Sequence, residues 1–121
     1  MKKILTILII FILMVTVTGC NKEEVKKELT DAEKFKQEYE SINGEESYGK
    51  KTREVTIPKD NPFIYKEAED IVKMMDNKET FLVYFGFNSC PWCRSVIEEL
   101  TKIAADNNLE TIYYVDVKDI R

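Results

Sequence analysis

The sequence predicts a small α/β domain in which strands and helices alternate along the chain. Residues 81–85 (FLVYF) are continuously apolar or aromatic and too short for a helix, which is typical of a strand buried on both faces of a parallel sheet. Apolar residues recur at helical spacing before this run, within 64–75, and after it, within 96–104. With a β-like run at each end, the order is βαβαβ, which implies parallel strands joined by crossover helices.

The first strand and the first helix of the domain are expected between residues 55 and 77. Residues 55–57 (VTI) form a short β-like run, which Pro58 ends. Asn61 can cap a helix, and Pro62 suits its first position because no N–H is lost there. We therefore expect a helix over about 62–77.

The remaining elements surround a pair of cysteines. We expect 81–85 to be the central strand of the sheet. After a short loop, a second helix is expected to begin at Cys90 and to end at Asn107-Asn108. A last strand is expected over 111–117 (TIYYVDV).

Residues 1–19 have the pattern of a secretion signal, in which a charged start precedes an apolar run. The run is shorter than the roughly 20 residues of a membrane-spanning helix, which disfavours an uncleaved anchor. Residues 17–20 (VTGC), which span the end of this signal and the residue after it, resemble the lipobox of bacterial lipoproteins. That resemblance implies that Cys20 carries a diacylglycerol and begins the mature chain. The chain would then be lipid-anchored on the extracytoplasmic face of a bacterial cell membrane, where disulfide chemistry is permitted.

Residues 20–51 are expected to form a charged, partly helical tether between the lipid and the domain at 52–121. Apolar residues recur there at spacings of three and four, namely Val25, Leu29, Ala32, Phe35, Tyr39 and Ile42. This stripe covers only about three heptads and lacks a strong cap, so a solvated spacer is favoured over a coiled coil or a partner-binding stripe. Turns are expected at Asn43-Gly44 and Tyr48-Gly49.

The composition of the 121 residues excludes several classes of function. Acidic side chains outnumber basic ones by 22 to 18, and no basic cluster is expected outside the first three residues, so nucleic acid is not an expected partner. The absence of histidine excludes Ser-His and Cys-His catalytic pairs and the commonest neutral metal ligand. No cofactor is implied. With Cys20 assigned to the lipid, Cys90 and Cys93 remain as an isolated pair.

Three interpretations of this pair are open. A structural disulfide between positions 90 and 93 would close almost no loop, so it would stabilise the fold very little. A zinc site usually needs four ligands, and the domain has no other cysteine or histidine, so no metal is expected. In the favoured interpretation the pair is redox-active, because backbone N–H groups at a helix N-terminus would stabilise a Cys90 thiolate. Pro91 would keep Cys90 outward, and Cys93, shielded one turn further in, would act second.

Two neighbouring side chains are candidate supporting residues. Trp92 is either an exposed docking surface for a protein substrate or packs against the loop, and the sequence favours neither. Arg94 either adds positive charge near the site or, as we favour, is solvated on the first helical turn.

Residues 81–94 (FLVYFGFNSCPWCR) resemble the active-site strand, loop and helix start of the thioredoxin superfamily. The expected order of elements is similar to the first portion of that fold. Together with the lipobox, the chain resembles the thioredoxin-like lipoproteins of Gram-positive bacteria, some of which are described as bacteriocin transport accessory proteins. The resemblance implies a membrane-anchored thiol:disulfide oxidoreductase, with Cys90 as nucleophile and Cys93 as resolving thiol. Protein disulfides or dithiols would be its substrates, and an unidentified membrane redox partner would reset the pair.

Three departures from this family affect what carries over. Pro91-Trp92 stands where thioredoxins have Gly-Pro, and Tyr84 stands where they have a buried, proton-accepting aspartate, although tyrosine with an ordinary pKa of about 10 is a poor base. The family's cis-proline loop and later strands have no counterpart before Arg121, so a C-terminally truncated chain is expected, with 81–85 as an open edge. The alternatives to an oxidoreductase are a non-catalytic lipoprotein that binds a transport or envelope partner, and an inactive fragment.

Overall fold

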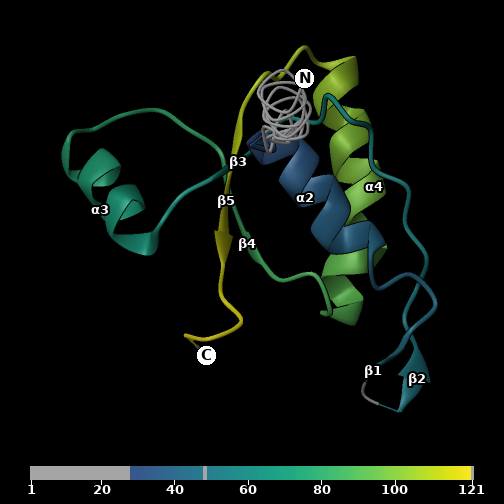
Figure 1. The fold of residues 1–121 in the computed structure, drawn as a ribbon. Helices are drawn as coiled ribbons and strands as arrows, with labels where there is room; N and C mark the ends of the chain where they lie inside the picture. The colour runs from purple at the N-terminus through teal and green to yellow at the C-terminus, as the bar shows by residue number, and fades with distance from the viewer. Residues whose placement is uncertain (1–27, 48, 121) are drawn as a thin grey trace, which may run out of the picture.

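The computed structural model describes residues 28–47 and 49–120 (Figure 1). The predicted signal at 1–19 and the predicted lipid-attachment residue Cys20 lie outside the described residues. The elements in chain order are α2 (Asp31–Glu40), β1 (Glu46–Ser47), β2 (Lys50–Lys51), β3 (Phe63–Tyr65), α3 (Ala68–Asp76), β4 (Val83–Gly86), α4 (Pro91–Asp106) and β5 (Ile112–Asp116). None of the helices in the described ranges is long and apolar enough to span a bilayer.

Strands β3, β4 and β5 form a parallel sheet in the order β3-β5-β4, with Gly86 opposite Asp116 in the β4–β5 pair. The predicted α/β class and the parallel pairing are therefore confirmed. The prediction that 81–85 is the central strand is wrong. β5 is central because it pairs with both neighbours, whereas β4 lies at an edge, where Phe85 is 51% exposed. The sheet order instead agrees with the other expectation from the sequence, that residues 81–85 form an edge strand.

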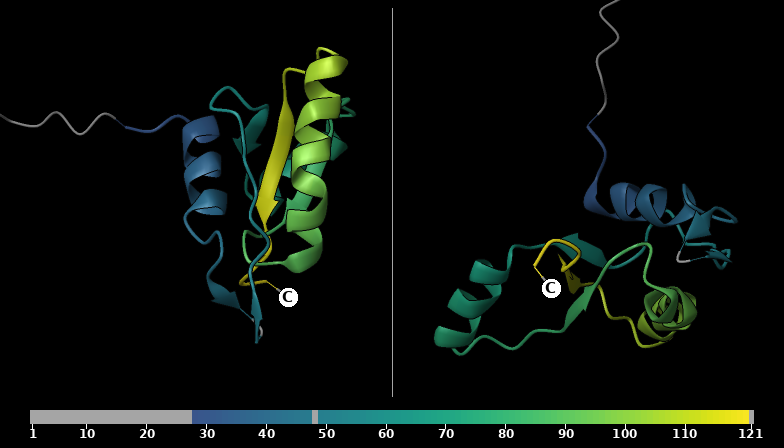
Figure 2. Two further views of the ribbon diagram at one scale, coloured as in Figure 1. Left: turned by 90° about the vertical axis from the view of Figure 1, so that its right-hand side faces the viewer. Right: turned by 90° about the horizontal axis from the view of Figure 1, so that it is seen from below.

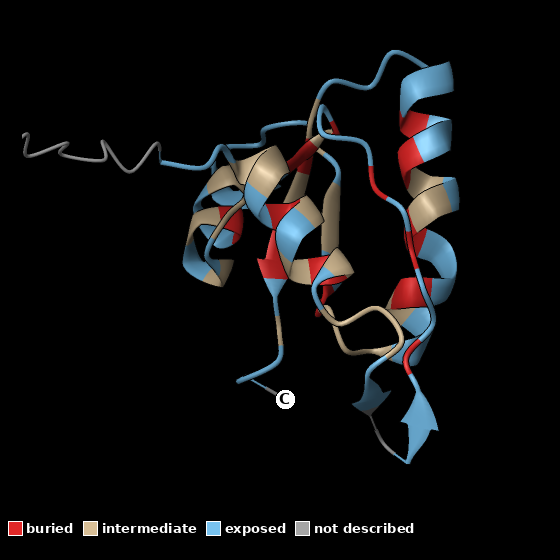
Figure 3. Cartoon of the chain, turned by 45° about the vertical axis from the view of Figure 1, so that its right-hand side comes forward, coloured by how far each residue is buried: buried red, intermediate tan, exposed pale blue. Residues whose placement is uncertain are grey.

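Helices lie on both sides of this sheet. α2 and α4 lie against one face, and α3 lies on the other (Figure 1, Figure 2). The core lies between the sheet and the layer formed by α2 and α4 (Figure 3), and the alternate residues Ile112 and Tyr114 of β5 both contribute to it. Its buried members are Phe35, Tyr39, Val55, Ile57, Phe63, Ile97, Ala104, Ile112 and Tyr114.

The first strand and the first helix of the sheet region begin later than predicted. Residues 55–57 bury two alternate side chains in the core, but they pair with no strand, and β3 is the first strand of the sheet. The helix predicted at 62–77 begins only at Ala68. The alternating pattern of 55–57 therefore reports burial of an extended segment and not membership of the sheet.

Asn61 is not a helix cap, which corrects the predicted role of the Asn-Pro pair. Its buried side-chain amide donates hydrogen bonds to the carbonyl oxygens of Ala32 and Pro58, both within 2.9 Å. Its side-chain oxygen accepts the N–H of Phe63 at 3.2 Å. The amide thus shapes the turn that leads into β3, because side chains of this type readily satisfy backbone groups two residues on.

Helix α2 is part of the domain, which corrects the solvated tether predicted within 20–51. Phe35 and Tyr39, one turn apart on α2, are both 0% exposed. The Phe35 ring stacks on Phe63 of β3 with 4.0 Å between ring centroids. Burial of two aromatic rings contributes enough hydrophobic free energy to hold this helix on the sheet.

Helix α2 begins with a strong cap, although none was expected from the sequence. The Thr30 hydroxyl accepts the N–H of Glu33 at 3.2 Å, and the Glu33 carboxylate accepts the N–H of Thr30 at 3.1 Å. This reciprocal pair is a capping box, which satisfies two N–H groups at the helix start.

Of the two glycines at which turns were predicted, Gly44 precedes a short antiparallel hairpin and Gly49 lies within it, between β1 and β2. Gly44 and Gly49 have φ of 72° and 70°, a left-handed conformation that glycine adopts at no steric cost. Strands β1 and β2 pair on either side of Gly49, with Glu46 opposite Lys51.

Candidate functional site

The two cysteines of the domain lie where strand β4 gives way to helix α4. Cys90 is the N-cap residue of α4, with an extended backbone (φ −71°, ψ 119°), and Pro91 follows in the first turn. The Sγ atom of Cys90 accepts the backbone N–H of Cys93 at 3.4 Å. The carbonyl oxygen of Cys90 accepts the N–H of Arg94 at 3.0 Å. The prediction that a helix begins at the cysteine pair is confirmed.

The two sulfurs are in contact but differ in their surroundings. The two residues are not joined by a disulfide in the structure, and both are partly exposed. The Cys93 thiol hydrogen-bonds with Cys90, and its pKa is raised, chiefly by burial and next by this bond. Hydrogen bonds with the Phe87 backbone and the Tyr84 side chain act in the opposite direction. Cys93 is therefore a protonated thiol at neutral pH, and its own N–H points to the Cys90 sulfur.

Tyr84 of β4 lies behind Cys93. Burial raises the pKa of Tyr84 well above its ordinary range, and its hydroxyl hydrogen-bonds with Cys93. A Cβ atom built on Gly86 would lie 2.9 Å from Cε1 of Tyr84 and 3.1 Å from Sγ of Cys93, so the three groups are closely packed. Tyr84 keeps its proton and donates it in a hydrogen bond, which excludes it as a base at neutral pH.

Trp92 projects from the first turn of α4 into solvent. Its side chain is 81% exposed, so it does not pack against the loop, which was one of the two open interpretations. Pro91 beside it is also exposed. The two residues present an apolar surface next to Cys90.

Arg94 is buried, which corrects the prediction of a solvated side chain. The residue is 1% exposed, and its guanidinium donates four hydrogen bonds to oxygen atoms from separate segments. Nε donates to the carbonyl of Arg53 at 2.7 Å, and Nη1 donates to the carbonyls of Tyr39 and Asn88 at 2.8 and 2.9 Å. Nη2 donates to the side-chain oxygen of Asn43. Burial lowers the pKa of Arg94, and the carbonyl oxygens compensate for the water that the cation has lost.

The position of Arg94 at helical spacing from the apolar residues of α4 was a sequence signal for its burial, and it was missed. The buried positions of α4 are Arg94, Ile97, Thr101 and Ala104, which share one face. Arg94 therefore continues the apolar stripe toward the N-terminus, where α2 and the segment after β2 cover it.

A basic cavity lies beside the chain neighbours of Cys90, although no basic cluster was expected outside the first three residues. Lys50, Lys51 and Arg53 line it together with Ser89 and Pro91, and its volume is about 180 Å³. The signal in the sequence was the run KKTR at 50–53, which the overall acidic balance concealed.

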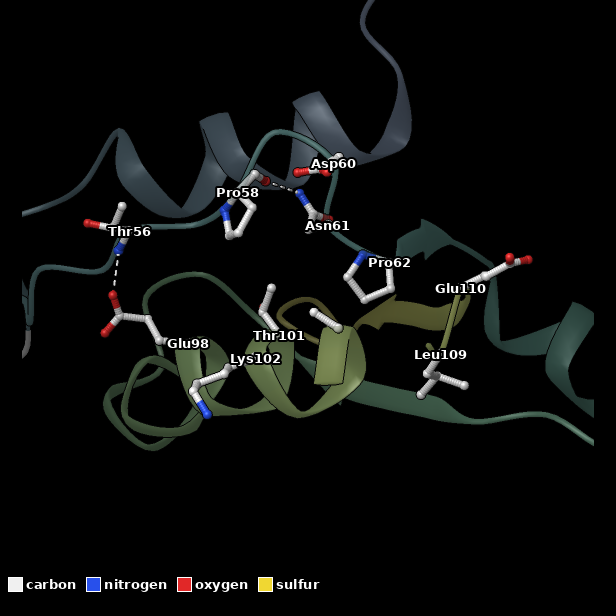
Figure 4. A pocket seen from close by; sticks show the side chains of 11 residues that line it. Thr56, Pro58, Asp60, Asn61, Pro62, Glu98, Thr101, Lys102, Leu109 and Glu110 are labelled. Carbon is white, nitrogen blue, oxygen red and sulfur yellow. Dashed lines mark hydrogen bonds between the residues drawn. The ribbon is translucent and has the colours of Figure 1, made fainter. Parts of the chain in front are cut away.

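A separate cavity of about 400 Å³ lies between residues 56–62 and α4 (Figure 4). Glu98 accepts the N–H of Thr56 at 2.8 Å at one end of it. Neither cysteine lines this cavity. In the part of the chain that the structure describes, no group of three or more acidic or cysteine side chains is placed to hold a metal ion.

Comparisons with known proteins return nothing: no protein-family model, no curated protein and no solved structure matches the chain.

Proposed function

We propose that the chain is a thiol:disulfide oxidoreductase with a thioredoxin-like arrangement, in which Cys90 attacks and Cys93 resolves. The observation that carries the proposal is the position of the Cys90 sulfur, which caps α4 and accepts the N–H of Cys93. An anionic sulfur at this position is favoured by the partial positive charge of the helix N-terminus. Cys90 therefore has the surroundings of an attacking thiolate.

The surroundings of Cys93 support its role as the second thiol. Its raised pKa keeps it protonated while Cys90 reacts. Its contact with Cys90 allows attack once a mixed disulfide has formed there. The Tyr84 hydroxyl would then stabilise the negative charge that develops on the Cys93 sulfur.

The proposed reaction moves two electrons in two exchanges of sulfur. The Cys90 thiolate attacks one sulfur of a substrate disulfide, a new S–S bond forms, and the other substrate sulfur leaves as a thiolate. Cys93 loses its proton to water and attacks the Cys90 sulfur, and the first substrate sulfur leaves as the second thiolate. The substrate is reduced to a dithiol, and the pair is oxidised to a disulfide. The reverse sequence oxidises a dithiol.

The order of the sheet gives further support to this proposal. β4 leads directly into the cysteine pair from the edge of the order β3-β5-β4, as expected for the first portion of a thioredoxin-like fold. A lipid on Cys20 would place the pair on the extracytoplasmic face of a bacterial membrane. Protein disulfides or dithiols there would be the substrates, and a membrane redox partner would reset the pair.

Trapping experiments on the full chain test the two roles. In a Cys20→Ser background, which removes the third thiol, Cys93→Ser is expected to hold a disulfide-containing peptide as a stable mixed disulfide on Cys90. Cys90→Ser is the matched control and is expected to trap no peptide. Mass spectrometry under non-reducing conditions measures the trapped fraction. Equal trapping by both variants, or trapping by neither, would contradict the proposal.

Equilibration with glutathione then gives the direction of electron flow. A reduction potential of about −270 mV indicates a reductant, and one of about −120 mV indicates an oxidant. An intramolecular disulfide that does not form at any glutathione ratio would also contradict the proposal.

A second candidate function is a non-catalytic binding module, which the edge strand β4 favours. Within the described residues β4 pairs only with β5, and Phe85 is half exposed beside the edge. Such an edge can accept an extended strand of another protein. This candidate predicts that replacement of both Cys90 and Cys93 by serine leaves partner binding intact, whereas the oxidoreductase loses its reaction.

A further inference from the structure

We propose that the basic cavity beside Cys90 docks an acidic polypeptide segment that flanks the reacting sulfur of the substrate. The inference deepens the proposed function and rests on it. Three cations form the proposed contact surface, which we call the basic cluster, namely Lys50, Lys51 and Arg53.

The cavity places the basic cluster beside the two chain neighbours of Cys90, although Cys90 itself does not line it. Besides the cluster it is lined by Ser89 and Pro91, the two neighbours of Cys90 in the chain, and also by Thr52, Arg94 and Ser95. Its volume of about 180 Å³ has room for a side chain or two, and not for a folded element. A segment whose acidic side chains enter this cavity would therefore lie alongside Cys90.

The basic cluster brings three cations together, whereas the other described lysines without an ion pair, Lys66, Lys78 and Lys118, lie apart along the chain. Elsewhere in the described chain, ion pairs with carboxylates are formed by Lys34, Lys36, Lys59, Lys73 and Lys102. Across 28–47 and 49–120, no member of the basic cluster forms an ion pair, although Glu46 lies opposite Lys51 and Glu54 follows Arg53. Glu45, Glu46 and Glu54 stand in the same segment, but none of them lines the cavity, so an acidic side chain that enters it meets cations and no carboxylate.

Arg94 holds the backbone of the basic cluster against the reactive loop. Its Nε donates to the carbonyl of Arg53 at 2.7 Å, and its Nη1 donates to the carbonyl of Asn88, two residues before Cys90, at 2.9 Å. The N–H of Thr52 also donates to the carbonyl of Glu45 at 2.7 Å. The cluster and the reactive loop share one buried anchor, so little backbone ordering remains to oppose docking.

A polypeptide fits this surface better than a free anion. The exposed Trp92 ring lies two residues after Cys90 and offers apolar contact area that a small anion would not use. A substrate that presents its sulfur to Cys90 must pass its flanking residues over the neighbouring surfaces. Carboxylates on one flank would reach the basic cluster.

Single-turnover exchange with two peptides tests the inference on the full chain. The peptides carry the same disulfide and differ only in three glutamates or three glutamines beside it. At low ionic strength the acidic peptide is expected to oxidise the reduced pair about tenfold faster. The triple variant Lys50→Gln, Lys51→Gln, Arg53→Gln should remove this preference, so that the ratio of the acidic-peptide rate to the neutral-peptide rate falls to about one.

A matched variant separates local contacts from net charge. Three exposed lysines, on α3, just after α3 and on α4, provide it as Lys73→Gln, Lys78→Gln and Lys102→Gln in one chain, which changes the net charge equally. This variant should keep the preference for the acidic peptide. Raising the ionic strength from about 0.01 M to about 1 M shortens the Debye length from about 30 Å to about 3 Å and should abolish the preference.

A binding measurement makes the result independent of exchange. Peptides with serine in place of cysteine are titrated against the full chain, and the fluorescence of Trp92, its single tryptophan, reports binding. The acidic peptide should bind at least tenfold more tightly than the neutral one, and only with the basic cluster intact.

The outcomes distinguish failure of the inference from failure of the proposed function. If neither disulfide peptide reacts, the proposed function fails, and the fluorescence titration still decides whether the cluster docks acidic segments. If both peptides react but neither rate nor affinity depends on the cluster, the docking inference is overturned and the exchange function stands. Cluster-dependent binding to phosphatidylglycerol vesicles without any binding of the acidic peptide would assign the surface to anionic lipid and also overturn it.

Discussion

Replacement of Arg94 by methionine is expected to destabilise the protein by about 3–5 kcal/mol. The guanidinium donates hydrogen bonds to the carbonyl oxygens of Tyr39, Arg53 and Asn88 and to the side chain of Asn43. Methionine has a similar length but no donor. Three of the four acceptors are backbone groups that no side-chain change can remove, so the variant leaves them without a partner.

The magnitude follows from two opposing effects. A hydrogen bond from a charged donor contributes about 1.5–3 kcal/mol, so the loss of four of them has an upper bound of about 6–12 kcal/mol. Against this, burial of the cation itself costs several kcal/mol, which methionine avoids. The side chain is 1% exposed, so water cannot fully replace the lost donors in the folded state. The remainder of about 3–5 kcal/mol is a large part of the stability of a domain of this size.

Urea unfolding of the full chain, followed by fluorescence, measures this loss. Arg53→Met is the matched control, because the Arg53 side chain is exposed and only its carbonyl oxygen contacts Arg94, and it should change the free energy by about 0.5 kcal/mol or less. Arg94→Lys keeps the charge and some donors, and should lose about half as much as Arg94→Met. A free energy for Arg94→Met within about 1 kcal/mol of wild type would refute the reasoning. If that variant does not fold, an Arg94→Lys value equal to wild type refutes it equally.

Two further predictions concern the packing around the site. Gly86→Ala should destabilise the protein by about 1–3 kcal/mol and alter the alkylation rate of Cys93, because the new methyl group would lie 3.1 Å from its sulfur. Stability should also fall with alkaline pH, because burial raises the pKa of Tyr39 and of Tyr114 well above the ordinary range. Both keep their protons in the folded state while the unfolded chain ionises above a pH of about 10. The stability is therefore complete below that pH, and each ring removes about 1.4 kcal/mol by about pH 11.

Each of these predictions has a control. Free energies of unfolding at pH 8 and pH 11 should differ less in Tyr39→Phe than in wild type, and a free energy that does not change with pH would exclude the linkage. For Gly86→Ala, replacement of Cys93 by alanine in the same chain removes one of the two crowding groups and should recover part of the loss. An unchanged free energy in the single variant would mean that the strand edge shifts freely.

The predictable part of the fold was encoded locally. The start of α4 follows from Pro91 in its first turn and from the apolar stripe that continues after it, and both signals act within a few residues. The strand at 112–116 and its parallel pairing follow from a β-like run at the end of a βαβαβ order. The Cys90 position at the helix start was predictable for the same reason.

The unpredicted part depends on contacts between distant segments. The VTI run at 55–57 and the β3 sequence have similar strand patterns, and only the position of β5 decides which of them joins the sheet. The stripe on α2 fits a solvated helix equally well until the sheet face that buries Phe35 exists. The role of Arg94 required both α2 and the segment after β2 to be in place, since its acceptors lie 6 to 55 residues away along the chain.

The buried guanidinium also explains why the thiol pair depends on α2, although α2 supplies no reactive group. Arg94 donates to the carbonyl of Tyr39 at the end of α2, at 2.8 Å. The side-chain amide of Asn88 donates to the carbonyl of Glu38 on the same helix, at 3.1 Å. The loop before Cys90 and the first turn after it are therefore tied to one helix end, whose position is set by aromatic packing against the sheet. A change that loosens α2 would reach the cysteine pair through these two hydrogen bonds without touching either sulfur.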